Sequence, residues 1–241
     1  MASSGERGSA QPTVSDSHQS GSNGPPVSHR KATLVSRNLV GVLSAAALAI
    51  PLVLTSSPAH AAIITGTNGP DTLHGTESAD EIRGLRGSDL LAGREGVDDL
   101  FGGRGGDELR GQRDNDFLFG NGGGDLVLGA VGADDIEGGN GDDALGGGPD
   151  EDFIAGGPRD DLVAGGGDGD ELEPGYGEDA VEAGAGNDTV LMTIDGTSTT
   201  RSSRDYVDCG DGEDTVFSPG GALDPRDEFE NCENFEDSDI P

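Results

Sequence analysis

The stretch GGRGGDELRGQRDNDFLFGNGGGDLVL, residues 102–128, decides the fold, because it repeats one nine-residue pattern three times. Each unit begins with a glycine-rich segment of five residues, continues with an aspartate, and carries an aliphatic residue two positions after that aspartate. The pattern extends outward from this stretch to Gly66 and to Leu191, so that fourteen units follow one another without an insertion. A fixed period of this length is typical of a repeat architecture rather than of an ordinary globular core.

The aspartate at the sixth position occurs in every one of the fourteen units. These residues are Asp71, Asp80, Asp89, Asp98, Asp107, Asp116, Asp125, Asp134, Asp143, Asp152, Asp161, Asp170, Asp179 and Asp188. The eighth position, from Leu73 to Val190, is always Leu, Ile or Val. Side chains alternate between the two faces of an extended strand, so positions six and eight point to the same side. We therefore expect the aliphatic residues to build a core and the aspartates to face the same interior.

The glycine-rich positions predict turns, because glycine permits positive φ and a close approach of the backbone. A short strand and a tight turn that alternate let the chain wind as a coil, with two of the nine-residue units in each coil. The predicted fold is all-β, a parallel β-roll (β-solenoid) of about seven two-repeat coils. Successive units would lie on opposite sides of the roll. The aspartates would then form two rows, one starting at Asp71 and the other at Asp80.

The predicted spacing of the aspartates points to a bound metal. Stacked strands lie about 4.7–4.9 Å apart, so carboxylates of neighbouring coils would repel strongly unless a cation lay between them. Calcium fits best, because it takes 6–8 oxygen ligands and accepts carboxylates together with backbone carbonyls. Magnesium prefers a tighter octahedral site, and transition metals would lack the paired His or Cys ligands they favour. Seven coils leave six gaps on each edge and so set a limit of about twelve calcium ions.

The charge of the chain also calls for bound cations. The sequence has 47 acidic and 14 basic residues and a formal net charge of −33, and from residue 62 onward it holds 45 acids and 10 arginines. Such a charge opposes compaction, and with 32% hydrophobic residues the metal-free sequence falls near the disordered class. We therefore expect a chain that is disordered without calcium and folds when calcium binds. Nucleic acid is not expected as a partner, because its phosphates would be repelled.

The units, from GTNGPDTLH at residue 66 to AGAGNDTVL ending at residue 191, resemble a known repeat. It is the glycine-glycine-x-glycine-x-aspartate-x-hydrophobic-x repeat of RTX (hemolysin-type) calcium-binding proteins of the secreted bacterial type. The resemblance covers residues 66–191 strongly and residues 200–217 weakly. It implies a β-roll that holds multiple Ca²⁺ ions at the repeat aspartates.

Residues 1–61 are predicted to be a disordered segment followed by a secretory signal peptide. A basic stretch at residues 30–37 precedes the apolar run from Leu39 to Leu54, and Ala-His-Ala at 59–61 has the pattern of a cleavage site. The run is shorter than the roughly 20 residues that span a bilayer, and an uncleaved anchor helix is the alternative. The resembling family is usually exported through a C-terminal signal. The N-terminal signal instead favours the general secretory pathway and a secreted, extracellular protein without a membrane span after cleavage.

After the β-roll of residues 62–191 the register breaks, and residues 192–241 are predicted to form a C-terminal cap with degenerate repeats. The nine-residue spacing of the aspartates recurs at Asp205 and Asp214, which would add calcium sites. An open solenoid end exposes unpaired backbone, and a cap would cover it.

The two cysteines of the chain, Cys209 and Cys232, both lie in this cap. Disulfides persist in exported proteins, so we expect the pair to form a bridge that pins the cap. The alternative is two unrelated thiols.

The repeat departs from its pattern at the fourth position, which is usually glycine. The exceptions are Ser78, Asp114, Asp150, Arg159 and Asp168. Four of them fall on the edge that starts at Asp80, and Arg159 places a cation close to Asp161. We therefore expect weaker or missing calcium around Asp161 and a less complete ladder along the edge of Asp80.

Some apolar residues occupy positions that are predicted to face solvent. Phe101 and Phe119 are two repeat units apart and would stack on consecutive coils, with Phe117 beside them. Leucines occur on the opposite face. Clusters of exposed apolar residues can mark contact surfaces, so these faces either pack against a neighbouring segment or bind a partner.

The sequence contains no recognisable catalytic constellation, and the chain is not expected to be an enzyme. His74 is the only histidine after residue 61, and neither a His-Glu-x-x-His zinc motif nor a Gly-x-Ser-x-Gly nucleophile elbow occurs. The predicted function is a secreted calcium-binding protein with a structural, surface or adhesion role. Its expected partners are calcium ions and a cell-surface or matrix component. The alternative is an accessory module or small enzyme that acts on extracellular polysaccharide or peptide.

Overall fold

The computed structural model describes residues 61–193, 204–218 and 223–237. The expected signal peptide, apart from Ala61, lies outside these residues. Within the three ranges the chain forms strands and turns, and no helix is present that could cross a membrane.

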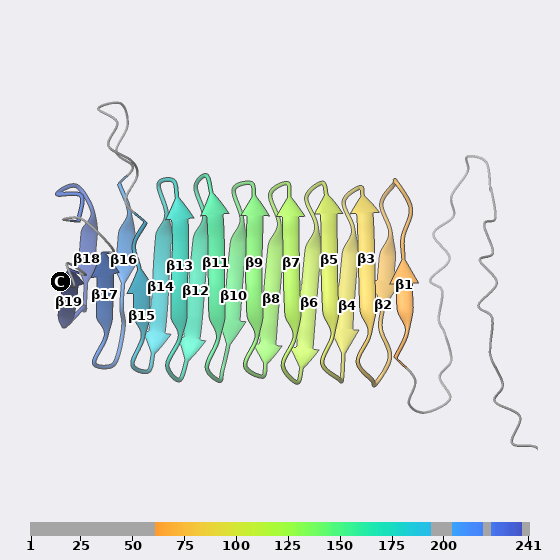
Figure 1. Ribbon diagram of the computed structural model, residues 1–241, viewed down its shortest axis with the longest axis horizontal. Coiled ribbons are helices and arrows are strands. Elements are labelled where there is room, and N and C mark those ends of the chain that lie inside the picture. The colour runs from red at the N-terminus through yellow and green to blue at the C-terminus, as the bar shows by residue number, and fades with distance from the viewer. Residues whose placement is uncertain (1–60, 194–203, 219–222, 238–241) are drawn as a thin grey trace, which may run out of the picture. The chain divides into compact units, whose positions relative to one another are not determined.

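The described residues form 19 strands, which alternate along the chain between two parallel sheets (Figure 1). The odd-numbered strands, which we call sheet A, are β1 (Ile63–Thr65), β3 (Glu81–Arg86), β5 (Asp99–Arg104), β7 (Phe117–Gly122), β9 (Asp135–Asn140), β11 (Phe153–Pro158), β13 (Glu171–Tyr176), β15 (Thr189–Leu191), β17 (Thr215–Ser218) and β19 (Asn234–Asp237). The even-numbered strands, which we call sheet B, are β2 (Thr72–His74), β4 (Leu90–Arg94), β6 (Glu108–Arg113), β8 (Leu126–Val131), β10 (Ala144–Gly148), β12 (Leu162–Gly167), β14 (Ala180–Ala185), β16 (Tyr206–Asp208) and β18 (Glu228–Glu230).

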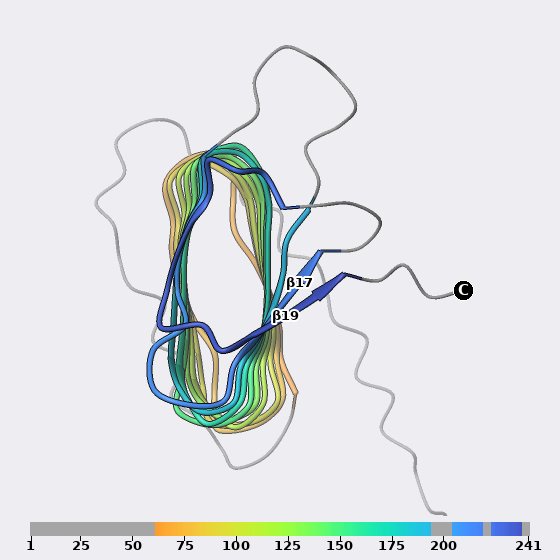
Figure 2. The ribbon, with the colours of Figure 1, turned by 90° about the vertical axis from the view of Figure 1, so that its left-hand side faces the viewer.

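The register of the sheets follows the repeat. Leu100 pairs with Ile82 on one side and with Leu118 on the other, each two repeat units away, so two units make one coil as predicted. Seen along the stack, successive coils superpose as one flattened loop with a sheet on each long side (Figure 2). The sheets contain 10 and 9 strands, which gives about nine coils rather than the seven expected. The excess arises because β1 and the four strands β16 to β19 join the stack outside the fourteen perfect units.

The aliphatic residues at position eight form a continuous core between the two sheets. Ile82, Leu91, Leu100 and Leu109 are fully buried, and the row continues in the same way to Val190. Full burial of such a side chain contributes about 1.5–3 kcal/mol relative to exposure, so this narrow core stabilises each coil against its neighbours. The repeat aspartates from Asp80 onward are buried in the same interior, as the alternation of side chains predicts.

The chain after Leu191 continues both sheets. Strand β16 lies between β14 and β18 in sheet B, and β17 lies between β15 and β19 in sheet A. A disulfide joins Cys209 to Cys232, whose Cα atoms are 5.1 Å apart, and this confirms the expected pairing. The division of the chain into a roll and a cap stays a prediction.

Candidate metal centre

A hydrogen bond to the next coil holds each repeat aspartate in place. The backbone N–H of Asp89 donates to Oδ1 of Asp107 over 2.8 Å, and the N–H of Asp107 donates to Oδ1 of Asp125 over 2.7 Å. The same contact recurs along both edges of the roll. The structure therefore brings the fourteen predicted aspartates together in two continuous rows, one starting at Asp71 and the other at Asp80.

The second carboxylate oxygen, Oδ2, is buried without a hydrogen-bond partner in 13 aspartates of the described ranges. They are Asp89, Asp98, Asp107, Asp116, Asp125, Asp134, Asp143, Asp152, Asp161, Asp170, Asp179, Asp188 and Asp214. A buried carboxylate is costly unless a cation or a hydrogen-bond donor compensates for its lost hydration. Two rows of such oxygens therefore indicate an interior that is built to receive cations.

Glycine at the first position of a unit leaves open the space beside Oδ2. A Cβ on Gly102 would lie 2.7 Å from Oδ2 of Asp107 and 2.9 Å from the carbonyl oxygen of Gly120 in the next coil. Twelve units begin with glycine, and in each of them Oδ2 lies within 2.8 Å of that Cβ position. In eleven of the twelve, a carbonyl oxygen of the following coil lies within 3.0 Å of the same point. A carboxylate oxygen and a carbonyl oxygen thus converge on one small space in each unit.

This donor set fits a hard cation. Among the described residues, no three His, Cys, Asp or Glu side chains gather as a group that could hold a metal ion. The oxygens that converge in the regular units are a carboxylate oxygen and a backbone carbonyl oxygen. Calcium accepts a mixture of carboxylate and backbone carbonyl oxygens in flexible turns. Zinc and copper favour His and Cys ligands, which these turns do not offer. The residues present therefore fit Ca²⁺.

Burial raises the pKa of the twelve repeat aspartates from Asp89 to Asp188. For Asp116, burial raises the pKa to about 8, assisted by the charges of Asp98 and Asp134 and opposed by the hydrogen bond from the backbone of Asp98. Burial likewise raises the pKa of Asp152 to about 7 and that of Asp179 to about 8. A cation next to these groups favours their ionised form and so removes the penalty.

The fourth position of the repeat keeps a left-handed backbone conformation at four of the five places where it is not glycine, and Ser78 is the exception. The backbone φ is 69° at Asp114 and 90° at Arg159, in the same left-handed region as the 105° of Gly96. The row of hydrogen-bonded aspartates that starts at Asp80 is unbroken past these positions. Loss of glycine therefore does not interrupt this row, and weaker calcium binding around Asp161 or along that edge stays a prediction.

The two degenerate repeats after Leu191 extend both rows. The N–H of Asp179 donates to Oδ1 of Asp205 over 2.9 Å, and the N–H of Asp188 donates to Oδ1 of Asp214 over 2.8 Å. Both receiving carboxylates are buried. Asp205 and Asp214 therefore continue the two rows of aspartates, as their nine-residue spacing predicted.

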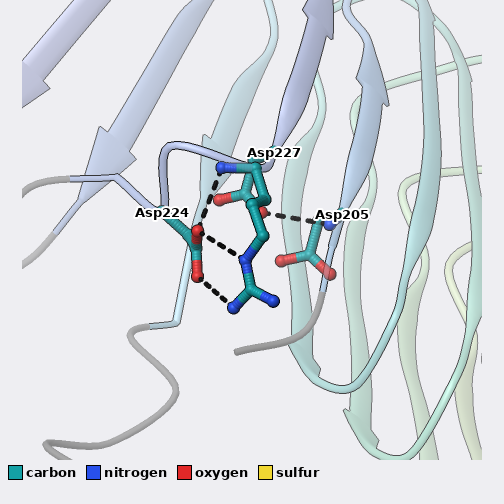
Figure 3. Close-up of polar contacts among 4 residues, drawn as sticks. Asp205, Asp224 and Asp227 are labelled. Carbon is teal, nitrogen blue, oxygen red and sulfur yellow. Dashed lines mark hydrogen bonds and ion pairs between the residues drawn. The ribbon is translucent and has the colours of Figure 1, made fainter. Parts of the chain in front are cut away.

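Sequence reasoning missed Asp227, which adds one more member to the row of Asp71. Its Oδ1 accepts the backbone N–H of Asp205 over 3.1 Å, and Figure 3 shows its side chain directed toward that residue. The neighbouring Arg226 donates to Asp224 on the same turn. A signal was present, because Asp227 and Phe229 keep the order of acid, any residue and hydrophobic residue. The separation from Asp205 is 22 residues, longer than the two units that separate regular partners, and this hid the match.

Glu233 plays the same part in the row of Asp80 and was also missed. Its Oε2 accepts the backbone N–H of Asp214 over 3.1 Å, at a separation of 19 residues. Phe235 follows two positions later, as a hydrophobic residue does in the regular units. The longer side chain of glutamate reaches the place that aspartate occupies elsewhere.

Comparison with protein families gives one match. A family model described as the RTX calcium-binding nonapeptide repeat matches residues 65–100, 93–127, 101–136, 119–154, 128–161 and 155–190. These segments overlap and together span residues 65–190, more than half of the chain. Comparison with curated proteins gives no match.

Proposed function

We propose that this chain, which belongs to the RTX calcium-binding nonapeptide repeat family, is a secreted protein whose β-roll folds when calcium binds. Its repeats bind Ca²⁺. The observation that supports calcium-dependent folding is the set of 13 buried Oδ2 atoms without a hydrogen-bond partner. An interior of this kind is unstable when its carboxylates are ionised and uncompensated, so metal binding energy becomes folding energy.

The proposed ligands are the fourteen repeat aspartates, from Asp71 to Asp188 at intervals of nine residues. The twelve from Asp89 to Asp188 would offer their partnerless Oδ2 to the ion, while the backbone N–H bound to Oδ1 fixes the orientation of the carboxylate. In Asp71 and Asp80, at the start of the two rows, Oδ2 also accepts the backbone N–H of Thr67 and of Thr76. The first glycine of the unit leaves the space, and a carbonyl oxygen of the next coil lies beside it. The adjoining aliphatic core excludes water, which strengthens the electrostatic attraction. When bound, calcium supplies the positive charge that offsets the repulsion within each row.

The proportions of the chain support a structural role. The described residues from 62 to 237 belong to the stacked sheets and their turns, and no part of them forms a separate catalytic domain. We infer an extracellular rod that becomes rigid in calcium and serves a surface or adhesive purpose. Extracellular calcium modules typically bind at about 10⁻⁴–10⁻³ M, so the chain would fold on leaving the cell.

The direct test is a calcium titration of the full chain, followed by calorimetry and by circular dichroism. We expect uptake of several ions, coupled to a change from a disordered to a β-rich spectrum, and reversal by a chelator. A spectrum that is already β-rich in a strong chelator at neutral pH, together with no calcium uptake, would overturn the proposal.

The second candidate is an accessory module or small enzyme acting on extracellular polysaccharide or peptide. The feature that favours it is an open groove of about 770 Å³ on the outer face of sheet A. Incubation of the calcium-loaded chain with panels of glycans and peptides separates the two functions. Cleavage of any panel member by the chain would establish an enzyme, whereas binding without cleavage would indicate an accessory module, and neither binding nor cleavage supports the structural role.

A further inference from the structure

The groove on sheet A has a lining that is unusual for so acidic a chain. It runs over the turn that follows β1 and over β3, β5, β7 and β9, and none of the described residues that line it is acidic. Its polar lining residues are Asn68, Arg83, Arg86, Arg104, Asn121 and Asn140. In a protein with 47 acids and 14 bases, a surface made only of arginines, asparagines and apolar groups is suited to an anion.

Two arginines of this groove face each other without an acidic partner. Arg86 on β3 and Arg104 on β5 occupy paired positions of adjacent strands, and both are exposed. Neither makes an ion pair within the described part of the chain, although exposed arginines elsewhere, such as Arg113 with Glu95, do. Like charges directly opposite each other on neighbouring strands are destabilising. An anion between the two guanidinium groups would turn this repulsion into attraction.

A third arginine is held in position beside them. The Arg83 guanidinium pairs with Glu81 at 2.7 Å and lies over the ring of Phe101, 5.2 Å from its centroid. Phe101 stacks on Phe119 with the centroids 5.1 Å apart, as their spacing of two repeat units predicts. These contacts link Arg83, Phe101 and Phe119 on three adjacent strands. Leu85 adds an exposed apolar side chain to the lining of the groove.

The basic character of the first coils extends beyond the groove. Outside the aspartate rows, residues 62–113 contain six arginines and five acids, whereas residues 114–191 contain one arginine and twelve acids. Calcium in the rows would leave this difference unchanged. Most of the groove therefore lies in the part of the regular repeats where acids outside the rows do not outnumber arginines, so the surface there repels an anionic ligand least.

We propose that this groove binds a linear polysaccharide that carries carboxylate groups. Arginine forms paired hydrogen bonds with a carboxylate, and the amides of Asn121 and Asn140 can both donate to and accept from sugar hydroxyls. Leu85, whose side chain is exposed, offers apolar contact for a sugar ring. The lining residues come from five successive coils, so the groove has a length on the order of 19 Å, which suits a chain molecule that lies along the roll.

The same geometry disfavours other polyanions. A single nucleic acid strand carries one charge about every 3.4 Å and relies on free aromatic faces for base stacking. Here the ring of Phe101 has Arg83 on one face and Phe119 stacked against it. Of the three arginines that line the groove, two make no ion pair within the described part of the chain, Arg86 and Arg104. An extended peptide usually joins the edge of a sheet through main-chain hydrogen bonds, and the groove lies on a face.

The experiment is a calorimetric titration of the full chain in saturating calcium, with the same calcium concentration in both solutions. The probes are short oligogalacturonates, neutral malto-oligosaccharides and oligothymidylate. The test variant is Arg86→Gln with Arg104→Gln. The matched control is Arg110→Gln with Arg113→Gln, two exposed arginines of β6 on sheet B. Circular dichroism in calcium confirms that both variants fold.

We expect oligogalacturonate to bind the wild type and the control alike, and the test variant to lose at least about tenfold in affinity. Malto-oligosaccharides and oligothymidylate should bind much more weakly. The proposal is overturned if neutral and acidic sugars bind equally, if oligothymidylate binds more tightly, or if the folded test variant keeps the affinity of the wild type. It is also overturned if sedimentation shows self-association that this variant abolishes, because a second copy would then occupy the groove. This inference needs only folded coils, so failure of calcium-dependent folding would appear in the dichroism and not in the choice among probes.

Discussion

At the scale of single residues, the first glycine of a unit determines the room that is left for calcium. We predict that Gly102→Ala removes one bound ion, because its Cβ would lie between Oδ2 of Asp107 and the carbonyl oxygen of Gly120. Overpacking of this kind costs about 1–3 kcal/mol, so the variant should also need more calcium to fold. The measurement is calorimetric stoichiometry together with the calcium midpoint of folding.

The matched control for this change is Gly167→Ala, since nothing lies within 4 Å of a Cβ at that position. It should keep the full stoichiometry and be neutral or slightly more stable. An equal loss of calcium in both variants would show that the space beside Oδ2 is not the site. The chain itself has side chains at the first position in Pro174 and Ala183, next to Asp179 and Asp188. The same reasoning expects weaker calcium there.

The second position of the repeat carries backbone strain that the sequence did not reveal. The backbone φ is 92° at Gln112 and 82° at Leu85, whereas glycine takes this conformation in later coils, with 101° at Gly139. A left-handed conformation costs an L-residue about 1–2 kcal/mol. We predict that Gln112→Gly stabilises the calcium-loaded roll by up to about 1 kcal/mol after the added freedom of the unfolded chain is subtracted. Urea unfolding in calcium measures it.

Gln112→Ala is the control for the lost side chain, because alanine keeps the unfavourable φ. It should give no gain in the free energy of unfolding. If alanine stabilises the roll as much as glycine does, the strain at this position is not the cause.

At the scale of strands and coils, the disulfide connects the irregular end to the regular repeats. Cys209 follows β16 and is fully buried, while Cys232 lies between β18 and β19. Replacing both cysteines with alanine should destabilise this end by about 3 kcal/mol on the loop-entropy model. Thermal unfolding of the full chain in calcium would then begin at a lower temperature. A variant with an unchanged unfolding profile would mean that the calcium rows alone hold β16 to β19.

The strands of the regular repeats could be placed from the sequence because the nine-residue period determines their positions, their pairing and which side chains are buried. A spacing of two repeat units sets the pairing of Ile82 with Leu100, the burial of both, and the row to which each aspartate belongs. The number of coils could not be read in the same way. Strands β16 to β19 add to the stack although their acids are 26, 22 and 19 residues from their partners. A solenoid tolerates these longer spacings, because each coil contacts only its neighbours and the extra residues can form a longer loop at a turn.

At the scale of the whole molecule, the buried aspartates couple folding to pH as well as to calcium. In the calcium-free roll, burial raises the pKa of Asp98 and Asp170 from 3.8 to about 7 and that of Asp116 to about 8. A raised pKa means that protonation favours the folded state. The stability that the protonated aspartates contribute to the folded state is fully present below about pH 3.8. It is lost as the pH rises through about 7 to 8.

We therefore predict that in chelator the β-rich signal of circular dichroism increases as the pH is lowered from 8 toward 4. In the presence of calcium, lowering the pH should instead oppose folding, because protons compete with the ion for the same carboxylates. The calcium midpoint of folding should then rise as the pH falls below about 7. A midpoint that stays constant across this range would contradict the assignment of the buried rows as the sites.

General loss of surface charge at low pH would also favour compaction, and two variants separate it from the effect of the buried rows. Asp116→Asn imitates the protonated acid, because the amide keeps an acceptor for the N–H of Asp98 and gains a donor near the carbonyl oxygen of Gly129. We predict that it reduces calcium uptake and makes the pH dependence in chelator shallower. Glu137→Gln removes one exposed charge on β9 and should change neither. If the two variants shift the pH profile by the same amount, net charge alone drives the folding, and burial of the carboxylates is irrelevant to it.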